Sequence, residues 1–329
     1  MTTQSETVGT PPLDASPDVQ VDWLEFVAFF NRRGVARLDR LDGALTIQEE
    51  DHLADDGASD AILDDRRALI EDEVEQRTKA LGAAYPFVMS DDGEELRIRV
   101  LNMRGAGFYF LCLIVSHFKY STILLSLPSD KDVARVRKEQ FQLLATLAVA
   151  GAIRGPAISM GWPRSSGETI LDVLNRMAAM GSTGIPRPVP GSEASPSAKD
   201  GGIDVIGWTN GINRLPPPLT MYFGQVASGH NWRAKSAVSE IDPFVSSFYL
   251  ERPKTNYAAI TIVPHRLFPS DHDQLAKKHG HILDRLRTPI AALRGFELAT
   301  FKRAEVDGYM AVSTISKWLI YYRRPRLTS

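Results

Sequence analysis

The second half of the chain alternates short β-prone segments with helical stretches, and this alternation limits the possible folds more than any other feature. The β-prone segments cover residues 203–208, 219–227 and 257–263. Helical patterns follow the second and third of them, at residues 232–238 and 281–293. Strands mixed with helices in this way predict an α/β or α+β core, a mixed central sheet flanked by helices.

The front of the chain has a different pattern. Residues 23–30 and 60–81 carry apolar side chains at helical spacing, and residues 107–120 are apolar almost throughout. Two short apolar runs, at 85–89 and 96–101, flank a Ser-Asp-Asp-Gly turn, which predicts a β-hairpin. We therefore expect a mostly helical N-terminal section with one small hairpin.

These patterns suggest a division into domains. Residues 1–21 are rich in Thr, Ser, Pro and Asp, and we expect them to form a disordered tail. A boundary between residues 125 and 130 separates a helical N-terminal domain, 22–128, from a layered domain, 129–329. The layered domain would begin with a long amphipathic helix over residues 130–151, with apolar side chains on one side.

Charge is distributed unevenly, although the formal net charge is only −2. Residues 42–75 hold 13 acidic side chains and two basic ones, whereas residues 284–329 hold nine basic and four acidic ones. A basic C-terminal segment can contact phosphate, and an acidic segment can bind a basic partner. Two solvated faces would explain the same counts.

Several classes of protein are excluded by missing motifs. The chain lacks a GxxxxGK[ST] phosphate loop, a GxGxxG fingerprint after a strand and a GxSxG elbow. Its single cysteine, Cys112, rules out an internal disulfide and a Cys-cluster zinc site, and the histidine spacing around His272, His279 and His281 matches no standard zinc site. Because no secretion signal or apolar run long enough to cross a bilayer is visible, we expect a cytoplasmic protein without membrane contact.

One stretch carries chemistry. Two glycines lead into an apolar strand that holds a single carboxylate, Asp204, and the next strand holds Gln225. Antiparallel pairing of these strands would set the carboxylate beside the amide, and a following helical turn would bring Lys235 to the same strand ends. A strand carboxylate, an amide oxygen and a backbone carbonyl such as that of Val226 are ligands suited to Mg²⁺ or Mn²⁺. A lysine can orient water or stabilise negative charge, and the set therefore suits phosphodiester hydrolysis.

This arrangement resembles the PD-(D/E)xK nuclease superfamily, and within it the Mrr-type restriction endonuclease branch. The nearer likeness is to bacterial restriction-like proteins linked to phage defence, which share a KDGGxD strand, a GQxAxG strand and a WxxK helix start. The matching residues are 199–204, 224–229 and 232–235, within a resemblance that covers roughly residues 130–290. The resemblance implies a restriction-endonuclease-like core and a magnesium-dependent deoxyribonuclease in an antiviral defence or restriction system.

The likeness also assigns roles to residues. Asp204, Gln225 and Val226 would hold the metal, and Lys235 would replace the motif lysine, because the position two after Gln225 is Ala227. On the long helix, Gln142 stands where such nucleases often have a catalytic glutamate. Further residues are candidates for contacts with the nucleic-acid backbone: His230, Arg164, His265, Arg266, Arg285 and Arg287.

A second interpretation stays open. With one anionic ligand, the chain could be a catalytically weak or inactive nuclease-fold subunit that binds DNA or a partner protein. A double-strand cut needs two active sites, which favours a homodimer. The acidic front section could dock a partner such as an ATPase of the same defence system.

Overall fold

The computed structural model describes residues 7–50, 59–119, 121–161, 167–181, 183–192, 201–211, 213 and 215–328. It is a mixed α+β structure, as the sequence pattern predicts, with two compact units. The first unit comprises residues 1–133 and 316–329, and the second comprises residues 134–315. Among the described residues, none of the helices combines the length and the apolar character that a membrane span requires.

The first unit is mainly helical. Its helices are α1 (Pro17–Phe30), α2 (Leu38–Glu50), α3 (Ser59–Leu81), the short η1 (Gly82–Ala84) and α4 (Met103–Ser116). Strands β2 (Phe87–Met89) and β3 (Glu95–Ile98) form the predicted hairpin. Strand β1 (Val35–Arg37), which the sequence pattern did not indicate, adds to β3 and completes a three-stranded antiparallel sheet.

A buried ionic network joins the helices of this unit. The guanidinium of Arg77 on α3 is fully buried and contacts three carboxylates: Asp22 at 2.7 Å, Glu25 at 3.0 Å and Glu73 at 2.8 Å. The hydroxyl of Tyr109 on α4 donates to Glu25 at 2.7 Å. The apolar pattern of these helices therefore encloses a polar centre that ties α1, α3 and α4 together.

The ends of the first unit differ from the expected boundaries. Residues 7–16 are not a free tail, because Gly9 donates to the carbonyl of Ile123 and accepts from the indole of Trp23. At the other end, Thr328 donates to the carbonyl of Phe30, and its own carbonyl accepts from Arg32. These long-range contacts assign residues 316–329 to the first unit, although the sequence placed them with the layered domain.

The second unit contains a five-stranded sheet in the order β10-β9-β7-β6-β4. Strands β10 (His281–Leu283), β9 (Asn256–Ile262) and β7 (Thr220–Val226) are parallel. Strand β6 (Val205–Thr209) runs antiparallel to β7, and β4 (Ala157–Ser159) antiparallel to β6. The expected strands at 203–208, 219–227 and 257–263 are thus present, whereas β4 and β10 were not predicted.

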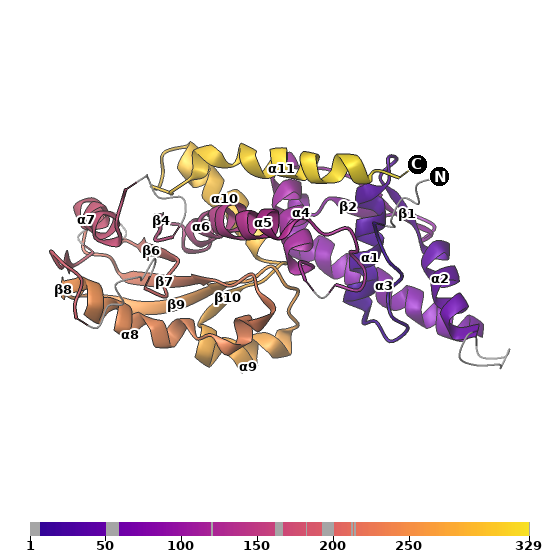
Figure 1. Cartoon of the computed structure of the whole chain (residues 1–329), viewed down its shortest axis with the longest axis horizontal. Coiled ribbons are helices and arrows are strands. Elements are labelled where there is room, and N and C mark those ends of the chain that lie inside the picture. Colours follow the sequence, from indigo (N-terminus) through magenta and orange to yellow (C-terminus); the bar gives the residue numbers. More distant parts are fainter. Residues whose placement is uncertain are drawn as a thin grey trace. The chain divides into compact units, whose positions relative to one another are not determined.

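Helices cover both faces of this sheet (Figure 1). Helices α7 (Ile170–Gly181) and α8 (Ala237–Phe248) share one apolar cluster with the sheet, and α9 (Pro269–His279) packs beside α8. Helix α6 (Gln142–Ile153) covers the other face, and α10 (Thr288–Thr300) packs on α6, with a close approach at Gly151 and Gly295. A Cβ on either glycine would lie 1.9 Å from a carbonyl oxygen of the opposite helix.

The remaining elements are short or connect the layers. They are α5 (Asp130–Arg135), the π-helical turn η2 (Val136–Phe141), β5 (Ile185–Pro186), η3 (His230–Ala234), β8 (Tyr249–Glu251), η4 (Tyr309–Ala311), α11 (Ser313–Arg323) and η5 (Arg324–Arg326). Two helical predictions need correction. The stretch 232–238 is mostly η3 and a loop before α8, and 281–293 begins with strand β10, so that α10 starts only at Thr288.

Candidate active site

Two of the predicted site residues, Asp204 and Gln225, lie at one edge of the five-stranded sheet. The parallel strands β7, β9 and β10 end there, and the antiparallel strand β6 begins there. Asp204 directly precedes β6, and Gln225 is the residue before the last one of β7. Ligands of sheets covered by helices commonly bind at the carboxyl ends of the parallel strands, and the edge is therefore the expected place for a site.

Asp204 is held at this edge by its backbone and its side chain. Its N–H donates to the carbonyl of Gly224 at 2.8 Å, and its carbonyl accepts from the N–H of Met160 at 2.9 Å. The carboxylate oxygen Oδ2 accepts the backbone N–H of Val226 at 2.7 Å. The half-buried carboxylate thus takes the place of a backbone acceptor where the β6–β7 ladder ends.

Gln225 lies opposite Asp204 and is buried, with 7% of its surface exposed. The register Val205↔Gly224 makes Asp204 and Gln225 the next pair, so that both side chains lie on the face covered by α8. Its side-chain oxygen Oε1 is shielded from solvent and accepts no hydrogen bond from any described residue. Such a buried oxygen costs about 1–3 kcal/mol, and a bound cation would offset this cost.

Gln142 supports Asp204 without touching its carboxylate. It is the first residue of α6, directly after the π-helical turn. Its amide Nε2 donates to the backbone carbonyl of Asp204 at 2.8 Å and to the hydroxyl of Ser159 at 3.2 Å. The structure thus shows Gln142 bound to the backbone of Asp204, and its expected catalytic role stays a prediction. Turns of π-helix are frequent at functional sites, because they re-aim one side chain of a helix.

Lys235 follows the turn η3 and is exposed. Its backbone N–H donates to the carbonyl of Trp232. The Trp232 side chain is buried in a cluster with Val263, and its ring centroid lies 5.0 Å from that of the tilted His279 ring. The side chain of Lys235 makes no hydrogen bond or ion pair with a described residue. The structure therefore brings together Asp204, Gln225 and Gln142, and leaves Lys235 exposed to solvent.

One acidic residue near this edge was missed by the sequence reasoning. A Cβ on Gly202, two residues before Asp204, would lie 2.6 Å from the carboxylate oxygen Oε2 of Glu240 on α8. Gly202 also has a φ of 84°, in the left-handed region that favours glycine. The second glycine of the motif thus leaves room for a second carboxylate beside the strand start. The sequence signal for Glu240 is its position in the first turn of the helix that follows Lys235.

The candidate metal ligands form a sparse set. Among the described residues, no group of three or more His, Cys, Asp or Glu side chains could hold a metal ion. Asp204 supplies a carboxylate, and oxygens of Gln225 and the Val226 backbone would have to complete the coordination. Oxygen donors of this kind fit a hard cation such as Mg²⁺, and the orphaned amide oxygen of Gln225 supports that fit.

Two histidines of the predicted backbone-contact set lie together. The rings of exposed His230 and half-buried His265 have centroids 5.5 Å apart, one following β7 and the other following β9. Arg266 donates to the carbonyl of Leu267, and its guanidinium lies 4.9 Å from the ring centroid of Phe268. Arg164 falls outside the described residues.

The remaining two arginines require a correction. The sequence placed Arg285 and Arg287 on a basic helix, but both lie in the loop between β10 and α10. Arg285 is only 1% exposed, and its N–H bonds to the carbonyl of His265, so it is a buried residue of the sheet edge and not a surface contact. Arg287 is exposed and lies 2.9 Å from the carboxylate of Asp284 and 2.8 Å from His272.

Asp284 fixes the loop that carries His265. Its buried carboxylate accepts the N–H of Leu267 at 3.2 Å. Burial alone would raise the pKa of Asp284, but the hydrogen bond from His272 and the charge of Arg287 outweigh it and hold the pKa below its usual value. The carboxylate is therefore ionised at neutral pH and works as a structural anchor.

Scans against protein-family models, curated proteins and solved structures gave no match for this chain.

Proposed function

We propose that this chain is a metal-dependent endonuclease that hydrolyses DNA phosphodiester bonds. The observation that carries the proposal is the pair Asp204 and Gln225 at the sheet edge, where the buried amide oxygen of Gln225 has no described hydrogen-bond donor. A carboxylate beside an unsatisfied carbonyl-type oxygen is suited to hold a divalent cation. The likeness of the KDGGxD and GQxAxG motifs to restriction-like nucleases supports the same chemistry and a role in antiviral defence.

The residues would divide the work as follows. Asp204, the Gln225 side chain and the Val226 carbonyl would hold Mg²⁺ or Mn²⁺, and Gln142 would fix the backbone of Asp204. A cation bound there would polarise the phosphodiester and help to activate water. Lys235, exposed after η3, would reach the site when substrate is bound and stabilise negative charge.

Substrate contacts would come from the loops at the same edge. His230 and His265 lie 5.5 Å apart and could contact one phosphate. The exposed Arg287 and the half-buried Arg266 extend the cationic surface along the ends of β9 and β10. A homodimer and a partner ATPase belong to the proposal only through the resemblance and the chemistry of a double-strand cut.

The second candidate is a nuclease-fold subunit that binds DNA or a partner protein without cutting. Two observations favour it: among the described candidates for metal ligands Asp204 is the one certain carboxylate, and the side chain of Lys235 forms no hydrogen bond or ion pair with a described residue. The two candidates differ in their dependence on metal, because only the enzyme requires a cation at Asp204.

A cleavage assay tests the proposal. Supercoiled DNA, linear DNA and RNA are incubated with the parent and with Asp204→Asn, in Mg²⁺, in Mn²⁺ and in EDTA. We expect the parent to cut DNA only with metal, and Asp204→Asn to lose at least a hundredfold in rate. Lys302→Gln, an exposed lysine outside the site, serves as the control and should cut like the parent. Equal cutting by Asp204→Asn would overturn the proposal.

A further inference from the structure

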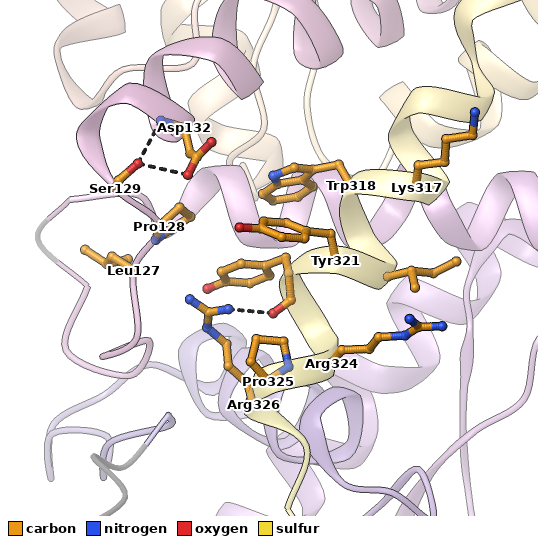
Figure 2. A pocket seen from close by; sticks show the side chains of 12 residues that line it. Leu127, Pro128, Ser129, Asp132, Lys317, Trp318, Tyr321, Arg324, Pro325 and Arg326 are labelled. Atoms are coloured by element: carbon orange, nitrogen blue, oxygen red, sulfur yellow. Dashed lines mark hydrogen bonds between the residues drawn. The ribbon is translucent and has the colours of Figure 1, made fainter.

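The first unit carries an open groove beside helix α11 that is independent of the sheet edge. The groove has a volume of about 980 Å³, and all its lining residues belong to residues 127–132 and 317–326. Figure 2 shows Trp318, Tyr321, Arg324 and Arg326 on one side, and Leu127, Pro128 and Asp132 on the other. The groove is thus a concave surface within one compact unit.

Positive charge dominates its lining. The lining holds three cationic residues, Lys317, Arg324 and Arg326, and a single acidic one, Asp132. Figure 2 shows the charged ends of Lys317 and Arg324 pointing away from Asp132. Lys317 and Arg324 are exposed and form no ion pair with a described residue. Arg326 donates to the backbone carbonyl of Tyr322 at 2.7 Å, and its guanidinium carbon lies 4.2 Å from the ring centroid of the same tyrosine. Two cations of the groove are therefore available to an anionic ligand.

An exposed aromatic residue, Tyr321, lies between these two cationic residues along the helical segment. Tyr321 is 68% exposed, whereas Trp318 and Tyr322 are buried and stack on each other at 5.2 Å. Lys317, Tyr321 and Arg324 are spaced by four and three residues, so that they share one face of the helical segment. At a rise of about 1.5 Å per residue, the backbone positions of Lys317 and Arg324 lie roughly 10 Å apart along the helical segment.

We infer that this groove binds single-stranded nucleic acid, with a base stacked on Tyr321 and backbone phosphates held by Lys317 and Arg324. A cationic track combined with exposed aromatic rings is the arrangement by which proteins bind single strands. A duplex keeps its bases stacked inside, so it could use the cations but not the ring. Asp132 on the opposite side repels phosphate and favours a backbone path along α11.

The inference does not depend on the proposed cleavage chemistry. The groove belongs to the first unit and the sheet edge to the second, so each can fail without the other. Binding is therefore measured in EDTA, where a metal-dependent cut cannot take place. If Asp204→Asn loses cleavage but still binds the single strand, cleavage at the sheet edge and strand binding in the groove are separate properties.

The test is a fluorescence-anisotropy titration of the full chain with a labelled thymidine strand of about 12 nucleotides. The matching duplex and a poly-glutamate peptide serve as competitors. We expect Tyr321→Ala and the double variant Lys317→Gln/Arg324→Gln each to raise Kd at least tenfold, while Tyr321→Phe binds like the parent. The control Lys79→Gln/Lys302→Gln removes the same charge away from the groove lining and should leave Kd unchanged.

Salt dependence distinguishes the two kinds of contact. Each phosphate contact to a single strand contributes about −0.7 to the slope of log K against log salt. In the double variant the slope of log K against log salt should be less negative by about 1.4, whereas Tyr321→Ala should leave this slope unchanged. No binding by the parent, competition by the duplex or poly-glutamate equal to that of the strand, or an unchanged Kd in both groove variants would overturn the inference.

Discussion

The carboxylate oxygen Oδ2 of Asp204 accepts the backbone N–H of Val226 at 2.7 Å. The same side chain that would hold a cation therefore also closes the end of the β6–β7 ladder. Structural and chemical roles of Asp204 must be separated by the choice of substitution.

Asp204→Asn keeps an oxygen that can accept the N–H of Val226, whereas Asp204→Ala removes the acceptor. We expect the alanine variant to lose about 1–3 kcal/mol of unfolding free energy, because it leaves a backbone N–H without its charged partner. The asparagine variant should stay within about 1 kcal/mol of the parent, since a neutral acceptor still meets the N–H. Urea denaturation in EDTA measures both. If the two variants are equally destabilised, the hydrogen bond to Val226 is not what Asp204 contributes to stability.

Gln225→Met removes the buried oxygen that has no described donor and keeps the side-chain length. In EDTA we expect the unfolding free energy to be unchanged or up to about 1 kcal/mol higher, because an unsatisfied buried polar atom is lost. Added Mg²⁺ should raise the Tm of the parent but not that of the variant, since a cation that binds only the folded state stabilises it. Differential scanning fluorimetry with and without Mg²⁺ checks this. A large loss of stability in EDTA would mean that Gln225 has a structural partner.

Arg77→Met breaks the buried network of the first unit. We expect a loss of about 3–5 kcal/mol, because the carboxylates of Asp22, Glu25 and Glu73 would remain buried without their cation. The control is Arg97→Met, which breaks an exposed pair with Glu95 and should have a much smaller effect. Chemical denaturation of both variants provides the comparison. Similar effects of the two substitutions would contradict the central role of the network.

His279 makes stability depend on pH. Burial, together with the nearby charges of Lys278 and Arg233, lowers the pKa of His279 below its usual value. The unfolded chain then binds the proton more readily, so stability should fall as pH drops below about 6.5. His279→Gln should reduce the slope of unfolding free energy against pH between pH 6.5 and the lower folded pKa. Denaturation curves measured across this range would contradict the account if parent and variant had the same slope.

Local sequence signals predicted the part of the site that depends on neighbouring strands. Asp204 and Gln225 lie on consecutive strands joined by a loop, so their pairing follows from antiparallel geometry, and the register bears this out. The hairpin β2–β3 was predicted for the same reason. A short apolar run bounded by turn residues is a strong signal when its partner is near in sequence.

Other features depend on contacts between distant segments and leave no local signal. The amide of Gln142 donates to a carbonyl 62 positions away, and the buried Arg285 is bonded through its backbone N–H to the carbonyl of His265, 20 positions before it. Strand β10 has only three residues and pairs with β9 in a parallel ladder, so its sequence resembles the start of the following helix. The need for glycine at positions 151 and 295 follows from the close packing of α6 against α10, which the sequence alone does not show.

The account depends most on a cation bound between Asp204 and Gln225. The most direct measurement is a calorimetric titration of Mn²⁺ into the metal-free parent, Asp204→Asn and Gln225→Met, with Lys302→Gln as the control. We predict binding of Mn²⁺ to the parent and the control, and at least tenfold weaker binding to both site variants. Equal Mn²⁺ affinity in all four proteins would contradict a cation site at this edge of the sheet.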